Sequence, residues 1–320
     1  MKTKISLFHH LILIVGFSSF SFGQLTIATW NIEHLGSSGR GFPEIKKGKL
    51  GDRTAEDYKM IATFIKDSLS LEVICVQEIA SSKKESEKSY SDELGQITSN
   101  LGTTWKYYLA NFEGGGSSEN EMQNAFIYNS DKVELKTVFE MDVPNYEIDE
   151  KKMFDRKPLI GYFIPNGEQD GFVIVNLHLA SGQDNFENHL ASMIIVEQNI
   201  VLQLKNKGIE KEKDIIILGD FNNNPFALKD NGDCCKYSDL MYKYMAEKGY
   251  SDLVDSSFVT TRMNKTLSSI IDHVLISKGA KKHISQNKAQ IFKPKDLSES
   301  GLFEWRSVYS DHFPIYFEYQ

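Results

Sequence analysis

The sequence predicts one α/β domain that covers residues from about 25 to 320 of the 320-residue chain. Three observations predict it: short apolar runs rich in β-branched residues recur, helical patterns lie between several of them, and no repeat or proline-rich linker divides the chain. The apolar fraction of 41% and the charged fraction of 25% are ordinary for a globular protein, which excludes disordered, collagen-like and coiled-coil chains. A chain of this length can bury a sizeable core.

Apolar runs predict the strands of this domain. Their length and their content of Val, Ile, Phe and Tyr are typical of buried or half-buried strands. The predicted strands cover residues 25–30, 73–76, 125–128, 172–177, 215–218, 270–276 and 315–319.

Helical spacing of apolar residues predicts three helices. In the first, Thr54 and Asp57 have the spacing of a capping box. The apolar stripe that follows consists of Tyr58, Ile61, Ala62, Ile65 and Leu69. The second helix has its stripe at Leu190, Met193, Ile194, Glu197 and Val201 and should end near Gly208. Leu240, Tyr244 and Met245 indicate the third.

The first 23 residues have the order of a secretory signal peptide. Lys2 and Lys4 precede an apolar run at 11–17, and small residues lead to Gly23, after which we expect cleavage. The alternative is an uncleaved anchor, but the run is shorter than the roughly 20 residues that a spanning helix needs. We therefore expect a mature domain of residues 24–320, secreted or periplasmic, with no membrane span after cleavage.

Charge and cysteine content exclude several functions. The net charge is −8, and −10 without the signal segment, which disfavours a basic protein that coats nucleic acid. A metal-dependent enzyme needs no such excess of Lys and Arg. Cys75 lies in an apolar run and should be a buried thiol. Cys234 and Cys235 are adjacent, which leaves a vicinal disulfide open, whereas no His or Cys spacing supports zinc.

Two polar stretches, 81–91 and 113–121, should be solvated surface loops, with substrate-contacting loops as the alternative.

Polar side chains cluster where the predicted strands end. The segments are Trp30-Asn31-Ile32-Glu33, Gln77-Glu78, Asn176-Leu177-His178, Gly219-Asp220-Phe221-Asn222, Ile271-Asp272-His273 and Ser310-Asp311-His312. Buried polar groups at a sheet edge need partners, so we expect them to converge on one another or on a cation. In a regular strand, residues i and i+2 share a face, so Asp220 could point with Asn222, and Asn31 with Glu33.

The residue types in this set predict a metal site. The oxygens of Glu78, Asp311, Asn31 and Asp220 suit Mg²⁺ or Mn²⁺ rather than zinc. Imidazoles beside such a cation are suited to stabilising a phosphoryl oxyanion.

The ordered set of segments resembles the endonuclease/exonuclease/phosphatase superfamily, with its deoxyribonuclease I-like fold, in a secreted bacterial-type member. Besides those segments, Arg156-Lys157-Pro158 matches the family pattern, and the matches span nearly all of the mature chain. The resemblance implies a four-layer sandwich of two packed mixed β-sheets flanked by helices. It also implies a phosphoesterase that depends on a divalent metal.

The resemblance also implies a role for each matched residue. Glu78 would be the main metal ligand, with Asn31 and Asp311 close to it. Asp220 and Asn222 would orient the attacking water, and Asn222, His178 and Arg156 would hold the substrate phosphate. His178 and His312 would flank that phosphate, and Asp272 would orient His312. A surface ion pair is the alternative for Arg156.

Other polar residues have no role from the resemblance. An orienting partner for His178 stays open among Glu121, Gln123 and Asn124. Glu33, His34, His189 and His273 match no role, and His273 should point away from Asp272 because strand neighbours face opposite sides.

Sequence motifs that distinguish subfamilies narrow the class of substrate. The segment after Gly219-Asp220 lacks the Asn-Tyr-Arg of inositol 5-phosphatases, and an exported chain is not expected in DNA repair. These features favour a monomeric endonuclease that hydrolyses DNA, with RNA as an open second substrate and with Mg²⁺ or Mn²⁺ as cofactor. The alternatives are a secreted sphingomyelinase or another phosphodiesterase or phosphatase, and a catalytically inactive binding module. A structural Ca²⁺ site and the number of catalytic metals stay open.

Overall fold

A computed structural model describes most of the predicted mature domain. The described residues are 24–36, 52–80, 89–111, 122–143, 147–148, 151–154, 156–181, 186–226, 239–258, 260–263 and 269–320. The predicted signal segment, Cys234 and Cys235, and most of both predicted surface loops lie outside them.

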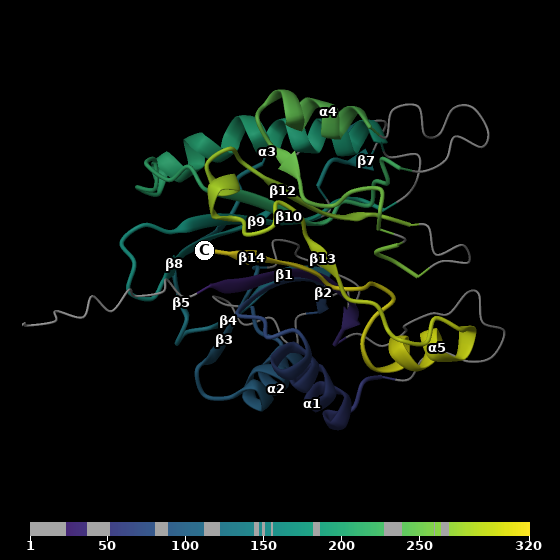
Figure 1. The fold of residues 1–320 in the computed structure, drawn as a ribbon. Helices are drawn as coiled ribbons and strands as arrows, with labels where there is room; N and C mark the ends of the chain where they lie inside the picture. Colours follow the sequence, from purple (N-terminus) through teal and green to yellow (C-terminus); the bar gives the residue numbers. More distant parts are fainter. Residues whose placement is uncertain are drawn as a thin grey trace, which may run out of the picture.

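Two six-stranded mixed sheets face each other at the centre of the molecule (Figure 1). The first sheet has the order β13 (Gln290–Ile291), β14 (Ile315–Tyr319), β1 (Leu25–Leu35), β2 (Val73–Ala80), β4 (Met122–Asn129) and β3 (Trp105–Leu109). The second has the order β11 (Ser251–Asp252), β12 (Asp272–Ile276), β10 (Ile215–Asp220), β9 (Phe172–His178), β8 (Leu159–Pro165) and β5 (Val133–Glu140). A small separate ribbon pairs β6 (Glu147–Ile148) with β7 (Lys151–Lys152).

Helices cover the outer face of each sheet, as Figure 1 shows. The first sheet packs against α1 (Ala55–Thr63), α2 (Asp92–Leu101) and α5 (Glu299–Val308), and the second against α3 (Phe186–Asn206) and α4 (Leu240–Glu247). A third apolar cluster fills the space between the sheets, where the rings of Phe126 and Phe163 meet edge to face at 5.2 Å. The four-layer sandwich is confirmed.

Local sequence signals explain several helix ends. The Thr54 side chain accepts from the Asp57 backbone N–H and the Asp57 side chain accepts from the Thr54 backbone, so the predicted capping box is confirmed. Helix α1 then passes into a π-helical turn, η1 (Phe64–Ser68), which contains Ile65 of the predicted stripe and is followed by Leu69 as its C-cap. Beyond α3, Gly208 has a φ of 75°, a conformation that glycine adopts without strain.

All seven predicted strands are present, but the sequence reasoning missed others. Strand β5 has charged side chains within its apolar pattern, and β3 and β8 gave no separate signal. Helices α2 and α5 and the 3₁₀ turn η3 (Ala280–His283) were missed as well. Pairing between strands, which a local pattern does not encode, fixes these segments in the sheets.

The directions of the strands give the two ends of the sandwich different character. Strand β1 runs parallel to β2, and β9 runs parallel to β10, so the carboxyl ends of all four strands meet at one end. Below that end, the buried amides of Gln77 and Asn176 join the two sheets by a hydrogen bond of 2.8 Å. Asn176 also donates to the Ala125 carbonyl at 3.0 Å. The two sheets are therefore held in register directly beneath the polar strand ends.

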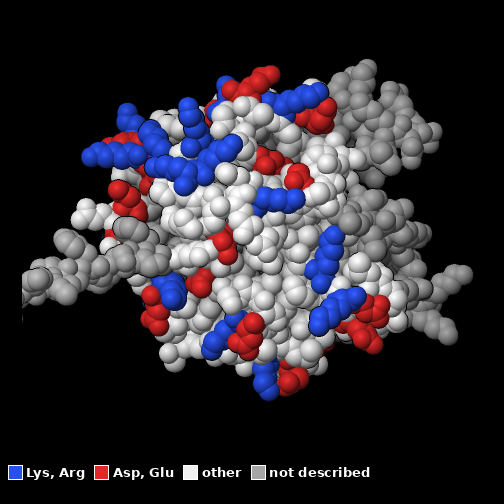
Figure 2. All heavy atoms as spheres, viewed as in Figure 1, with Lys and Arg blue, Asp and Glu red and all other residues white. Residues whose placement is uncertain are grey.

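The outer surface carries charges of both signs. Figure 2 shows Asp and Glu mixed with Lys and Arg over one face, with the densest basic group near the end of α3. Among the described residues, no helix has the length and apolar character needed to cross a bilayer.

Candidate active site

Four strands bring their polar ends to one point. Asn31 comes from β1, Glu78 from β2, His178 from β9 and Asp220 from β10, so each sheet contributes two side chains. The Asn31 amide nitrogen donates to Glu78 Oε1 at 2.9 Å and to Asp220 Oδ2 at 3.0 Å. This one amide therefore bridges the two sheets and draws two carboxylates together.

His178 completes the central cluster. Its Nε2 lies 3.6 Å from Asp220 Oδ2 and 3.9 Å from Glu78 Oε1. One ligand atom from each of Glu78, His178 and Asp220 lies within 4.8 Å of the others, as expected of groups that share one cation. His178 Nδ1 is buried with no hydrogen-bond partner among the described residues.

None of the described residues therefore orients His178 through Nδ1. Asn124 donates to the Asn176 carbonyl at 3.3 Å, and Glu121 lies outside the described residues.

His312 and Asp272 form a buried pair beside this cluster. His312 Nδ1 lies 2.8 Å from Asp272 Oδ2, which fixes the ring. Its Nε2 lies 3.8 Å from Asp220 Oδ2 and 3.8 Å from Asp311 Oδ1. The loop that precedes β14 thus places the His312 ring beside the Asp220 carboxylate.

The protonation states in this site differ because the charges around each group differ. Burial raises the pKa of Asp220 to about 7, with a smaller contribution from Asp272. Burial alone would lower the pKa of His312, but the carboxylates of Asp272 and Asp311 outweigh it and raise that pKa to about 10. Burial, followed by the nearby Arg156 charge, holds the pKa of His178 well below its usual range. One imidazole is therefore cationic and the other neutral at pH 7.

Glu78, His178 and Asp220 form a donor set that fits a divalent cation. The Glu78 side chain is 18% exposed, so the cluster is open to solvent, and the Glu78 and Asp220 carboxylates share one neutral amide donor. A hard cation would balance them.

The predicted metal ligands Asn31 and Asp311 also contact residues outside the central cluster. Asn31 Oδ1 accepts from the Glu33 backbone N–H at 3.0 Å, so the amide presents its nitrogen to Glu78 and Asp220. Asp311 lies beside His312 and accepts from Arg262 Nε at 3.1 Å. The structure therefore brings Asn31 to Glu78, and it places Asp311 with the imidazole and the guanidinium.

Arg156 and Asn222 lie at the rim. Arg156 is half-buried, and its Nε donates to the Met122 carbonyl at 2.8 Å. Asn222 donates its backbone N–H to Asp220 Oδ1 at 2.9 Å, while its side-chain nitrogen donates to the Leu179 carbonyl at 2.9 Å. Asn222 therefore contacts Asp220 through its backbone rather than by sharing its strand face.

Irregular backbone produces these orientations. Of the six described non-glycine residues with positive φ, four lie at these strand ends: Glu33, His34, Glu78 and Asn222. The β1–β2 register shifts after Asn31. Such bulges redirect side chains at functional sites, at a cost in backbone strain. Simple strand alternation, which pairs Asn31 with Glu33, is wrong here for that reason.

Sequence reasoning missed a supporting network behind the site. The Glu33 carboxylate accepts from Arg306 Nε at 2.8 Å and from the Asp311 backbone N–H at 3.1 Å. Arg53 donates to the backbone carbonyls of Ile32 and Glu33. These contacts fix the end of β1 against the loop that carries Asp311. A pattern search could find Glu33 near Asn31, but its partner is 273 residues away.

Ser310 of the matched segment is part of this support. Its Oγ donates to the Asn31 carbonyl at 2.6 Å and accepts from the His312 backbone N–H at 3.0 Å.

The three histidines that match no role, His34, His189 and His273, lie in different places. His34 Nε2 lies 3.5 Å from Glu78 Oε2 at the solvent side of the cluster. His273 bonds Asp252 at 2.8 Å and so points away from Asp272, as predicted. His189 is buried and contacts the Ala180 carbonyl at 2.7 Å. Of the three, only His34 contacts the cluster.

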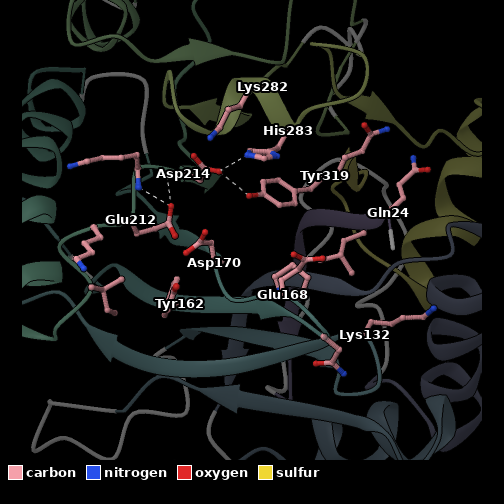
Figure 3. A pocket seen from close by; sticks show the side chains of 18 of the residues that line it. Gln24, Lys132, Tyr162, Glu168, Asp170, Glu212, Asp214, Lys282, His283 and Tyr319 are labelled. Carbon is pink, nitrogen blue, oxygen red and sulfur yellow. Dashed lines mark hydrogen bonds and ion pairs between the residues drawn. The ribbon is translucent and has the colours of Figure 1, made fainter. Parts of the chain in front are cut away.

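A cavity of about 1430 Å³ lies at the opposite end of the sandwich (Figure 3). Asp214 precedes β10 there and contacts His283 Nε2 and the Tyr319 hydroxyl, each at 3.1 Å. None of the predicted site residues lines this cavity. The cavity is therefore separate from the carboxylate and imidazole cluster.

Sequence comparison identifies the family. The Endonuclease/Exonuclease/phosphatase family matches residues 28–312. The chain belongs to this family. Together with the buried cluster, membership in the endonuclease/exonuclease/phosphatase family indicates a metal-dependent phosphoesterase. A search of curated proteins gave no significant match.

Solved structures support the fold of this family member. The human Nocturnin catalytic domain with bound sulfate anion is 14% identical, with a TM-score of 0.58 over 93% of this chain and 94% of that chain. The 3′ phosphatase NExo from Neisseria bound to product DNA hairpin is 13% identical, with a TM-score of 0.55 over 92% and 99%. The Bacteroides thetaiotaomicron mannosyl-6-phosphatase is 16% identical, with a TM-score of 0.54 over 92% and 98%. At these identities the likeness establishes the fold alone.

Proposed function

We propose that the mature chain is an exported divalent-metal-dependent endonuclease that hydrolyses DNA phosphodiesters. One observation carries the chemistry: Asn31, Glu78, His178, Asp220 and the His312–Asp272 pair converge from both sheets at one solvent-accessible point. The signal-like first 23 residues support action outside the cytoplasm.

Glu78, with Asn31 beside it, would hold the metal. When bound, Mg²⁺ or Mn²⁺ supplies positive charge that polarises a phosphoryl oxygen and stabilises the leaving oxygen. Asp311, which lies beside His312, would complete the group of metal ligands on the side of that imidazole.

The imidazoles would stabilise the phosphate. His312 is held by Asp272 with Nε2 toward Asp220, so its cationic ring can donate to a phosphoryl oxygen. His178, at the end of β9, is neutral and offers a hydrogen-bonding nitrogen beside Asp220. Arg156, at the rim, would bind the same phosphate.

Asp220 would orient the attacking water, with Asn222 fixing Asp220 Oδ1 through its backbone N–H. The water oxygen forms a bond to phosphorus in line with the ester bond that breaks, and its proton passes to Asp220. His312 can protonate the leaving oxygen. No covalent intermediate with the protein is needed.

Relatives of this fold act on different phosphoesters. The NExo structure contains a DNA hairpin product, which supports a nucleic acid substrate, whereas the mannosyl-6-phosphatase shows that the same fold serves sugars. We propose DNA as the substrate, with RNA next, and a monomeric enzyme.

Supercoiled plasmid tests this proposal. We expect residues 24–320 to nick it in Mg²⁺ or Mn²⁺, and we expect EDTA or the Asp220→Ala substitution to abolish nicking. Lys136→Gln, an exposed change on β5, is the matched control and should retain full activity. An intact plasmid with hydrolysis of bis(4-nitrophenyl) phosphate would refute the nuclease and leave a small-molecule or lipid phosphodiesterase. No hydrolysis of either would favour the inactive binding module.

A further inference from the structure

Arg262 lies at the mouth of the site on a backbone that is held firmly in place. Its N–H donates to the Ser269 carbonyl at 3.1 Å, and the next residue, Met263, donates to the Asp311 carbonyl at 2.7 Å. Arg262 also forms an isolated β-bridge with His312. The segment that precedes β12 is therefore fixed to the loop that carries His312.

Only part of the Arg262 guanidinium is hydrogen-bonded. Its Nε donates to Asp311 Oδ2 at 3.1 Å, and 46% of the side chain is exposed. Among the described residues, the guanidinium hydrogen-bonds through Nε alone, so its two terminal nitrogens can donate to a ligand. A guanidinium that is held through one nitrogen and is half exposed is suited to binding an oxyanion.

Strand order places Arg262 and Arg156 on opposite sides of the cluster. Arg262 precedes β12 and Arg156 precedes β8, whereas His178 and Asp220 end the strands between them, in the order β12, β10, β9 and β8. Three strand spacings span about 14 Å. Arg262 adjoins the cluster directly, because the Asp311 carboxylate that it contacts lies 3.8 Å from His312 Nε2.

We propose that Arg262 binds a second anionic group of the substrate, on the β12 side of the phosphate that is cleaved. This inference rests on the proposed phosphodiesterase function and narrows it. A substrate with negative charge beside the scissile phosphate, such as a nucleic acid strand, fits guanidinium groups on both flanks. A diester with a cationic neighbour, such as a choline lipid, would be repelled.

The alternative is that Arg262 serves only to neutralise Asp311. His312 and Arg306 already act on that carboxylate together with Arg262, and together they hold its pKa below the usual range even though burial acts in the opposite direction. A purely structural role would affect all substrates equally. A binding role would affect only substrates that carry the second charge, so selectivity separates the two.

The test compares three thymidine trinucleotides. One has two phosphodiesters, and the others have a neutral methylphosphonate in place of either the first or the second. In each isomer, cleavage at its one phosphodiester is compared with cleavage of the same linkage in the fully charged trinucleotide. These rates are measured as kcat/KM for wild type, Arg262→Gln, Arg262→Lys and the control Lys136→Gln, with thermal unfolding as the folding check. Bis(4-nitrophenyl) phosphate serves as the diester without a flanking charge.

We expect wild type and Lys136→Gln to prefer the fully charged trinucleotide over one methylphosphonate isomer by about tenfold, equivalent to about 1.4 kcal/mol. Arg262→Gln should lose that preference, and Arg262→Lys should retain part of it. An unchanged preference in folded Arg262→Gln overturns the inference, as does a wild type that shows no preference or cleaves only bis(4-nitrophenyl) phosphate. If wild type hydrolyses no diester at all, the proposed function fails and this inference fails with it.

Discussion

Replacing Arg306 with alanine should both destabilise the protein and slow hydrolysis. Arg306 pairs with Glu33 through Nε, at 2.8 and 3.0 Å to the two carboxylate oxygens, and through Nη2. The side chains are only 12% and 4% exposed, respectively, so the Glu33 charge lies in a region of low dielectric constant. The same carboxylate accepts from the Asp311 N–H. Loss of the guanidinium therefore disturbs the segment that carries Asp311 and His312.

The size of the effect follows from burial. Removing one partner of a buried ion pair costs about 3–5 kcal/mol, and the slight exposure of Arg306 favours the lower end, about 3 kcal/mol. For a domain of this size, 1 kcal/mol corresponds to about 2–4 °C, which predicts a fall in Tm of about 6–12 °C.

The assay is thermal and denaturant unfolding of Arg306→Ala, with hydrolysis of a generic diester measured on the folded fraction. Lys59→Ala is the matched control, because Lys59 forms an exposed pair with Glu56 and its loss should cost less than about 1 kcal/mol. A Tm within 2 °C of wild type, together with unchanged kcat, would show that the Glu33–Arg306 pair neither stabilises the fold nor positions the site.

Three further changes should have distinct effects. Gly219→Ala should destabilise the protein by about 3 kcal/mol or more, measured by urea unfolding, because a Cβ would lie 1.9 Å from the Leu177 carbonyl at a φ of 143°; a loss below 1 kcal/mol would contradict this. Asp272→Asn should lower kcat by about 100-fold with little change in KM, because His312 loses its orienting carboxylate; a loss under threefold in steady-state kinetics would argue against that role. Burial lowers the pKa of His189, so the unfolded chain takes up a proton first and the free energy of unfolding falls as pH drops below about 6.5. His189→Gln should flatten that fall by up to about 1.4 kcal/mol per pH unit in urea titrations between pH 7 and 5, and equal slopes for the two proteins would refute the assignment.

Local sequence pattern predicted the parts of this protein that depend on neighbouring residues. The capping box of Thr54 and Asp57 involves residues three apart, and the structure shows both of its hydrogen bonds. The apolar runs that predict strands require only burial on both faces. Strand β5 was missed because its charged residues interrupt the apolar pattern, and pairing with β8 decides its conformation.

The candidate site was predicted as a set of residues, and the structure supplies its arrangement. Asn31 and Asp220 were found as polar strand ends, but the hydrogen bond that joins them links residues 189 apart. Arg262 was missed because it lies in an irregular segment with no motif. Its position beside Asp311 depends on a contact across 49 residues.

The sequence by itself determined the fold class, the order of the main strands along the chain and the polar residues that end them. Each of these depends on the pattern of apolar and polar residues within a short stretch of chain. The tertiary structure alone decided which of those residues meet. The bulge after Asn31 turned Glu33 toward Arg306, and β10 aligned with β12 to set Asp220 beside Asp272. Strand register and backbone irregularity arise from long-range packing, which periodicity along the chain does not specify.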